Sequence, residues 1–305
     1  MRKFRVFLWF ICAVISLAVL SGIAFWMRPV ECFRELLYVR LALNGVESRS
    51  VTVAGHRMHY DAAGPADGPP VVLVHGLGGR AEDWANLAPL LVRAGFRVYL
   101  PDLPGFGRSE QPVDFSYSIA DQAGAVVGFM DAVGLKQVDL GGWSMGGWIV
   151  QWIASQHPDR VKRLILFDSA GLYVKPEWNT ALFTPANAAE LDQLDALLMP
   201  HPPVFPAFVA ADLLRVSHRN AWVTRRALDS MLTGRDSTDK LLPGLKMPVL
   251  IVWGDEDRIT PPSEGQTIHT LIPQSQLEVA AGCGHLAPGQ CADKIAPGLV
   301  EFLRR

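Results

Sequence analysis

The residues best suited to chemistry are the five at positions 142–146, with the sequence GWSMG. They follow an apolar run at 138–140 and precede a stretch with helical spacing at 148–157. Glycines on both sides allow a sharp turn between a strand and a helix, and this turn pushes the Ser144 hydroxyl out above a sheet edge. The pattern therefore predicts a serine nucleophile.

A serine hydroxyl needs a base near neutral pH, and the base needs an acid that orients its ring. His285 is the candidate base, because it follows Gly284 in a predicted loop from which it can reach back over the sheet. Three aspartates compete for the role of acid: Asp168, Asp255 and Asp257. Asp255 is the least suited, since its side chain is placed to close the turn at 254–257.

Five motifs, in this order along the chain, resemble the α/β-hydrolase superfamily. They are HGLGG at 75–79, DLPGFGRS at 102–109, GWSMGG at 142–147, GDEDRITP at 254–261 and GCGH at 282–285. Within the superfamily they are similar to the lipase and esterase branch. An apolar N-terminal segment together with a helical insertion resembles the membrane-bound monoacylglycerol lipases. The resemblance implies that Ser144 is the nucleophile, Asp257 the acid and His285 the base.

The same resemblance implies an oxyanion hole, in which two backbone N–H groups stabilise the negative charge of a tetrahedral intermediate. Met145 is expected to supply one, because it follows the nucleophile at the start of a helix. Leu77 is expected to supply the other, with Gly78 as the alternative. In this family His75 shapes the turn after its strand and does not act as the base.

Strands and helices are predicted to alternate from residue 51 to the C terminus. Residues 51–63 are expected to form two edge strands, and later apolar runs lie at 71–74, 97–100, 138–140, 164–167, 249–253 and 277–279. Helical spacing between these runs predicts the α/β-hydrolase fold, with a mostly parallel, doubly wound sheet.

The alternation stops between about residues 174 and 246, which are predicted to form an inserted helical cap. Its aromatic side chains are expected either to line an acyl pocket or, more often, to form the core of the cap itself. These residues are Trp178, Phe183, Phe205, Phe208 and Trp222.

The N-terminal residues 1–27 are predicted to be a membrane anchor, since 6–27 contain no charge and are long enough to span a bilayer. A cleaved signal peptide, with a site at 22–24 and a secreted product, is the alternative. Residues 28–50 are predicted to link the anchor to the catalytic domain through an interfacial helix. Basic residues before the span favour a cytoplasmic N terminus and an extracytoplasmic catalytic domain.

Composition narrows the possible partners. The formal net charge of −2 gives no reason to expect nucleic-acid binding, and no cofactor or metal is implied by the motifs.

The chain has four cysteines, Cys12, Cys32, Cys283 and Cys291, without a CxxC pair. Cys283 and Cys291 are expected to be free thiols, with a disulfide as the alternative in an oxidising compartment.

The leading prediction is a carboxylester hydrolase that cleaves lipid-like esters, such as monoacylglycerols, through an acyl-enzyme on Ser144. Hydrolysis of small soluble esters or of carbon–carbon bonds next to a ketone is the alternative. A non-catalytic binding protein of the same fold is disfavoured, because such proteins usually lack one of the three residues that are present here.

Overall fold

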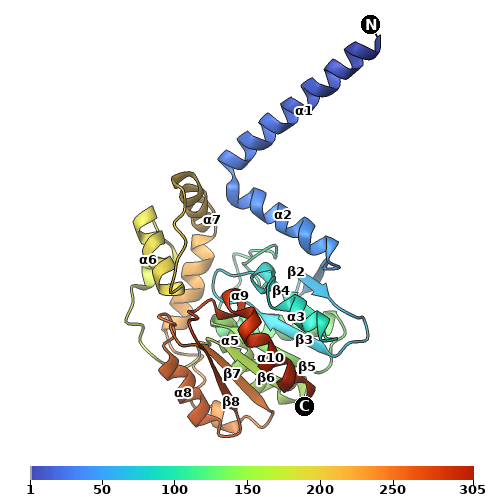
Figure 1. Cartoon of the computed structure of the whole chain (residues 1–305). Coiled ribbons are helices and arrows are strands. Elements are labelled where there is room, and N and C mark those ends of the chain that lie inside the picture. The colour runs from blue at the N-terminus through green and yellow to red at the C-terminus, as the bar shows by residue number, and fades with distance from the viewer. Residues whose placement is uncertain (1) are drawn as a thin grey trace.

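An eight-stranded sheet organises the chain in the computed structural model, which describes residues 2–305 (Figure 1). The strands are β1 (Glu47–Val53), β2 (His56–Ala63), β3 (Pro70–Val74), β4 (Arg97–Pro101), β5 (Val138–Trp143), β6 (Val161–Phe167), β7 (Val249–Gly254) and β8 (Gln276–Ala280). Their order is β1-β2-β4-β3-β5-β6-β7-β8. Only β2 runs antiparallel to its neighbours, so the predicted mostly parallel sheet is confirmed. The first strand begins at Glu47 rather than at residue 51.

Both faces of the sheet are covered, which explains why the central strands β3, β6 and β7 consist largely of apolar residues. Val72 and Val74 of β3 point into one core with helices α4 (Ile119–Ala132), α5 (Met145–Gln156) and α8 (Pro262–Leu271). Val71 and Leu73 point into the other core with α3 (Ala88–Arg93) and α10 (Ala292–Arg304). This alternation is the two-residue period of a strand.

A helical segment connects β6 to β7. It contains the short helix η3 (Thr180–Phe183), the helices α6 (Ala188–Leu198) and α7 (Ala207–Leu232), and η4 (Leu242–Gly244). Asn187 caps α6 by accepting a hydrogen bond from the backbone N–H of Glu190. Helices α6 and α7 stand beside the carboxyl ends of the strands (Figure 1), the edge where the Ser144 turn also lies.

Two N-terminal helices, α1 (Arg2–Met27) and α2 (Pro29–Leu43), precede the sheet. Helix α1 projects away from the rest of the molecule (Figure 1), and its segment Trp9–Met27 is apolar and long enough to cross a membrane. Its mean hydropathy is 2.3, and none of it is buried. Such a helix is either an anchor or a signal sequence.

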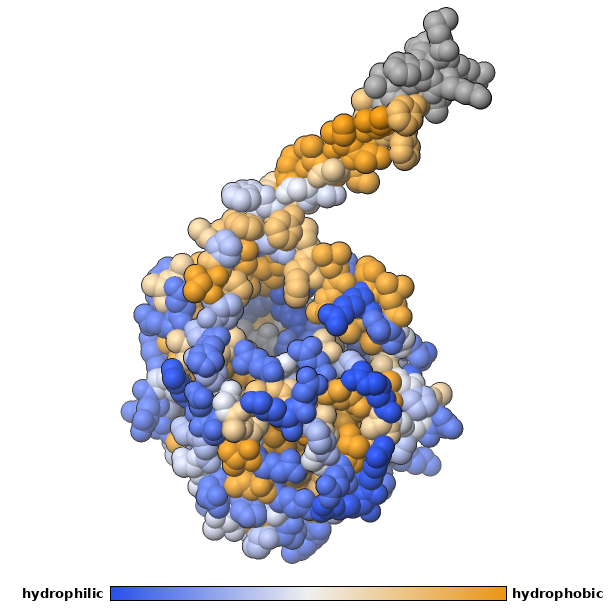
Figure 2. Space-filling view, viewed as in Figure 1, coloured by the Kyte–Doolittle hydropathy of each residue, from blue (hydrophilic) through white to orange (hydrophobic). Residues whose placement is uncertain are grey.

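Helix α2 turns Glu31 and Tyr38 toward the protein and exposes a stripe of apolar side chains. Glu31 pairs with Arg215 of α7 at 3.2 Å, and the Tyr38 ring lies under the guanidinium of Arg108, 4.1 Å from its centre. The exposed residues Phe33, Leu36, Val39 and Leu43 recur at helical spacing on the other side. An exposed apolar stripe is unusual on a surface helix, and Figure 2 shows apolar surface along the N-terminal helices.

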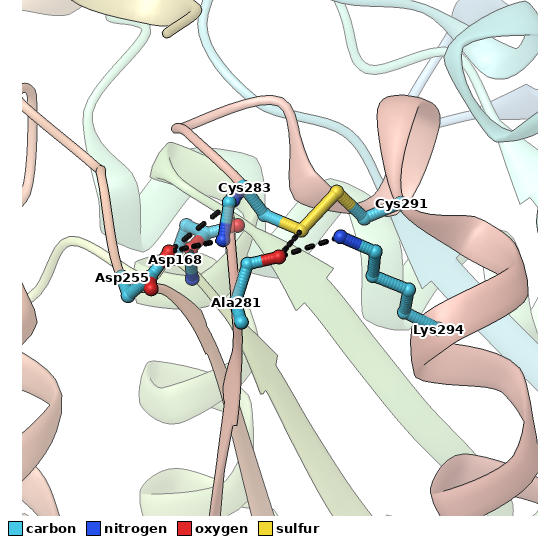
Figure 3. Close-up of a disulfide and its surroundings, with 8 residues drawn as sticks. Asp168, Asp255, Ala281, Cys283, Cys291 and Lys294 are labelled. Atoms are coloured by element: carbon cyan, nitrogen blue, oxygen red, sulfur yellow. Dashed lines mark hydrogen bonds between the residues drawn. A yellow bond between two sulfur atoms is a disulfide. The ribbon is translucent and has the colours of Figure 1, made fainter.

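Cys283 and Cys291 form a disulfide, so the prediction of two free thiols is wrong (Figure 3). Their Cα atoms are 6.3 Å apart because the loop after β8 folds back against the start of α10. Lys294 strengthens the same junction by donating to the carbonyl of Ala281 at 2.6 Å. The eight-residue separation of the two cysteines in the sequence does not indicate that this loop folds back toward α10. The bridge ties the segment that carries His285 to the adjoining helix.

Candidate active site

Ser144 lies in a turn whose backbone is held under strain. It joins β5 to α5 with φ of 56° and ψ of −120°, a conformation that L-residues rarely adopt. The turn fits because no side chain intervenes: a Cβ at Gly146 would lie 2.2 Å from the Val74 carbonyl oxygen, and one at Gly142 would lie 2.2 Å from the Gly146 carbonyl oxygen. The glycines therefore let α5 approach β3 closely enough to raise the serine above the sheet.

The structure brings Ser144, His285 and Asp257 together from three separate segments. Oγ of Ser144 lies 2.8 Å from Nε2 of His285, and Nδ1 of His285 lies 2.8 Å from Oδ2 of Asp257. All three residues are buried. When Nδ1 carries the proton and donates to Asp257, Nε2 is the free acceptor for the serine hydroxyl.

Asp257 is fixed by three further hydrogen bonds. Its Oδ1 accepts from the backbone N–H groups of Ile259 and Thr260 at 2.8 and 3.0 Å, and its Oδ2 accepts from the Thr260 hydroxyl at 2.8 Å. These donors hold the carboxylate in the orientation in which it faces Nδ1 of His285. Sequence reasoning missed Thr260, although its place three residues after Asp257 in GDEDRITP is typical of a turn closed by the aspartate.

The two alternative acids do not contact His285. Asp168 is fully buried and accepts the backbone N–H of Gly254 at 2.7 Å. Burial, and then the charge of Asp257, raise the pKa of Asp168 well above its usual value. Asp255 instead accepts the backbone N–H groups of Gly282 and Cys283 at 2.7 and 3.3 Å, so its side chain ties the 254–257 turn to the loop before His285 rather than closing the turn itself.

The segment at 75–79 lies directly against the serine. A Cβ at Gly76 would be 3.1 Å from Cβ of Ser144, and Leu77 lines the same cavity as Ser144. Met145 is the first residue of α5, so its backbone N–H belongs to the free N-terminal turn of that helix. His75 lies away from this contact: its Nε2 accepts the backbone N–H of Leu103 at 3.0 Å, and its buried ring has a lowered pKa.

Asp102 joins the 75–79 segment to the DLPGFGRS turn. Its carboxylate accepts the backbone N–H groups of Ala81 and Arg108 at 2.7 and 2.8 Å and lies 2.8 Å from Nδ1 of His59. Although burial opposes the charge, the hydrogen bonds and nearby His75 lower the pKa of Asp102. Gly107 has φ of 55°, and a Cβ there would overlap this carboxylate.

A cavity of about 250 Å³ opens above Ser144 and is mostly apolar. Figure 2 shows a hollow in the surface below the N-terminal helices. The part of the wall that comes from the segment between β6 and β7 consists of Phe183, Pro185, Leu191, Leu194, Leu198, Leu213, Val216, Ser217, Asn220 and Thr224.

The cap aromatics mostly pack elsewhere. Of the five, only Phe183 lines the cavity, and the Trp178 ring packs on it. Phe208 stacks on Trp26 of α1 with ring centres 4.6 Å apart, and Trp222 packs on Tyr117. For Phe208 and Trp222 the expectation of a place in the core of the cap is therefore wrong, because α7 turns them toward neighbouring elements.

The sequence model of the α/β hydrolase fold matches residues 69–224 and 230–289. This chain belongs to the α/β-hydrolase family. The match contains the segments that supply Ser144, Asp257 and His285. Among residues 2–305, no three His, Cys, Asp or Glu side chains are grouped so as to hold a metal ion.

Other α/β-hydrolases are similar over nearly the whole chain. Lipase 1 of Psychrobacter immobilis is 30% identical, with 90% of this chain and 89% of the lipase aligned. A 2-hydroxymuconate semialdehyde hydrolase of a Pseudomonas species is also 30% identical, over 84% of this chain and 93% of its own. The crystal structure of a membrane phospholipase A superposes with a TM-score of 0.83 at 26% identity, covering 100% of this chain and 98% of the other.

Asp257→Asn is expected to lower kcat for ester hydrolysis by about 10³–10⁴-fold, because an amide no longer fixes the histidine tautomer. Asp168→Asn is the matched control. It is expected to cost less than about tenfold, since His285 hydrogen-bonds to Asp257 and an amide oxygen at position 168 can still accept from Gly254. The kcat of both variants for hydrolysis of p-nitrophenyl butyrate distinguishes the two aspartates. A larger loss of kcat in Asp168→Asn would contradict the assignment of Asp257 as the acid.

Proposed function

We propose that this α/β-hydrolase is a serine carboxylester hydrolase that acts on lipid-like esters. The observation that carries the proposal is the continuous hydrogen-bonded chain from Ser144 through His285 to Asp257 at the base of an apolar cavity. The similarity to a lipase and to a membrane phospholipase A supports the same activity.

The geometry supports acyl transfer in two steps. Ser144 Oγ attacks the ester carbonyl while His285 Nε2 takes its proton, and Asp257 stabilises the resulting imidazolium. The backbone N–H groups of Leu77 and Met145 are proposed to hold the oxyanion. His285 then gives the proton to the departing alcohol, which leaves an acyl-enzyme on Ser144. Water, activated by His285, releases the acid and restores the serine.

The cavity wall favours a lipid-like acyl group over a small polar one. Leucines of α6 and α7 face the space above Ser144, so an alkyl chain can be buried there at about 0.8 kcal/mol per methylene group. The similarity to a 2-hydroxymuconate semialdehyde hydrolase keeps carbon–carbon bond hydrolysis as the second candidate.

We further propose that α1 anchors the protein in a membrane and that the exposed side of α2 lies in the interface. The apolar stripe of Phe33, Leu36, Val39 and Leu43 has no protein partner and follows the end of α1 after Arg28. Such a stripe is stable when it is buried among lipid headgroups and acyl chains. The aligned membrane phospholipase A covers the whole of this chain, including α1.

The disulfide supports an extracytoplasmic catalytic domain. A pair such as Cys283–Cys291 persists in an oxidising compartment and is rare in the cytosol. This agrees with the basic residues Arg2, Lys3 and Arg5 before the span, which favour a cytoplasmic N terminus.

Hydrolysis of p-nitrophenyl esters from acetate to palmitate, with monoacylglycerols in parallel, tests the proposed activity. Turnover is expected to rise with chain length, and Ser144→Ala is expected to lower kcat by on the order of 10⁴-fold. A fluorophosphonate probe should label the wild type and not the variant. Turnover of a ring-cleavage product without ester hydrolysis would favour the second candidate instead.

Leu194→Phe is expected to reduce kcat/KM for the palmitate ester by about tenfold, because the larger ring takes space from a long acyl chain. The acetate ester, which does not reach α6, should change by less than about twofold. Leu197→Phe on the same helix is the control, since Leu197 does not line the cavity. Equal losses on both esters would show that the acyl chain does not bind against α6.

Deletion of residues 2–27 is expected to convert the protein from resistant to sensitive to carbonate extraction, because the only apolar span among the described residues is removed. Full-length protein released by carbonate would contradict the anchor.

Protease added to intact cells or spheroplasts should digest the catalytic domain, and full protection would place it in the cytoplasm.

A further inference from the structure

One side of helix α7 carries polar side chains to the cavity above Ser144. Ser217, Asn220 and Thr224 all line this cavity, and their spacing of three and four residues puts them on one face of the helix. Successive members of this polar stripe are about 4.5 and 6 Å apart along the helix axis. Arg80 adds a charged side chain to the wall, but the stripe itself is uncharged.

The hydroxyl groups of Ser217 and Thr224 have no hydrogen-bond partner within the part of the chain that the structure describes. A serine or threonine in a helix can donate to the carbonyl one turn earlier. Thr267 and Thr270 of α8 do so, at 2.8 and 2.9 Å. Thr224 does not, although it is only 6% exposed and buried polar groups are nearly always paired. Its hydroxyl is therefore available to a ligand in the cavity.

Asn220 is held in place by a contact from outside α7. Its Oδ1 accepts a hydrogen bond from Nε2 of Gln111 at 3.0 Å, and the same Nε2 donates to the carbonyl of Gly105 at 3.1 Å. The Nδ2 group of Asn220 has two N–H donors and no acceptor among residues 2–305. The polar stripe thus offers two amide donors and two hydroxyls that can each donate or accept.

The polar stripe and the leucines of α6 belong to different parts of the cavity. Gln111 connects the stripe to the turn at 102–109, whose residues 106 and 107 also line the cavity. The α6 leucines are joined to the loop of the catalytic histidine, since a Cβ at Gly284 would lie 2.8 Å from the Leu198 carbonyl oxygen. A bound substrate therefore meets apolar surface in one part and uncharged hydrogen-bonding groups in the other.

We infer that Ser217, Asn220 and Thr224 form a binding site for the hydroxyl groups of a neutral polyol that is esterified to the acyl chain. This inference rests on the proposed ester hydrolysis and narrows its substrates to esters whose alcohol portion bears further hydroxyls. In the proposed binding mode the acyl chain lies against α6, which leaves the stripe for the alcohol. A polyol pairs with the amide and hydroxyl groups of the stripe, whereas a simple alkyl alcohol would bury them unpaired.

Hydrolysis of 1-monobutyrin and of propyl butyrate by the full-length protein in a neutral detergent tests the site. The two esters share the acyl chain and a three-carbon alcohol and differ by two hydroxyl groups. The wild type is expected to favour 1-monobutyrin by about tenfold in kcat/KM. Thr224→Val removes one hydroxyl at nearly constant volume, and Ser217→Ala removes the other. Each should lower the ratio of the two kcat/KM values by about fivefold.

Two further variants serve as controls. Thr224→Ser keeps the hydroxyl and should retain the wild-type ratio to within about twofold. Ser230→Ala removes a hydroxyl from the same helix at a position that does not line the cavity, so it should leave the ratio unchanged. Fluorophosphonate labelling of Ser144 checks that each variant keeps a folded active site. Ser217→Ala is read alone if Thr224→Val does not label.

Three results would overturn the inference. A wild type without a preference for 1-monobutyrin, or a preference that persists in both Thr224→Val and Ser217→Ala, would exclude the polyol site and leave ester hydrolysis intact. A preference for p-nitrophenyl 3-hydroxybutyrate over p-nitrophenyl butyrate that is lost in these variants, without a preference for 1-monobutyrin, would show that the stripe binds the acyl portion instead. If the wild type hydrolyses neither butyrate ester and does not label, the proposed serine hydrolase activity fails, and the polyol site fails with it.

Discussion

The close approach of α5 to β3 is the constraint on which the site depends. A backbone carbonyl of β3 occupies the space where a side chain at Gly146 would begin, so the first turn of α5 can lie directly on the strand end. This contact places Ser144 in its strained conformation and directs the N terminus of α5 toward Ser144. The surrounding sheet must hold the strain, and two apolar cores on its faces supply the packing that does so.

Buried polar groups then fix the loops around that turn. Asp102 holds the segment after β3 from one side, and the Asp257 turn holds His285 from the other. In each case a carboxylate is surrounded by backbone and side-chain donors, because an unpaired charge would be unstable at such depth. Asp168 lies beside these groups, and its burial and the neighbouring Asp257 raise its pKa well above the usual value.

The fold and the grouping of Ser144, His285 and Asp257 were predictable because their signals are local. The glycines around Ser144 and the apolar runs each predict the backbone conformation within a few residues. The order of the motifs along the chain predicts the topology. The disulfide and the pocket wall depend on how distant segments pack, which no short pattern records. Asp257 could be preferred over Asp168 from the motif, but the physical difference between them became visible only in their hydrogen bonds.

The junction between α1 and α2 is a single non-helical residue, Arg28, and Phe208 of α7 stacks on the last turn of α1. A connection this short leaves little freedom for the domain to swing away from the axis of α1. For an enzyme held by such an anchor, encounter with substrate is a search in two dimensions, within the membrane that holds it. Its rate then follows the mole fraction of substrate among neighbouring lipids rather than the bulk concentration. Diluting the substrate with inert lipid would slow such an enzyme, whereas adding more vesicles of the same composition would not speed it up.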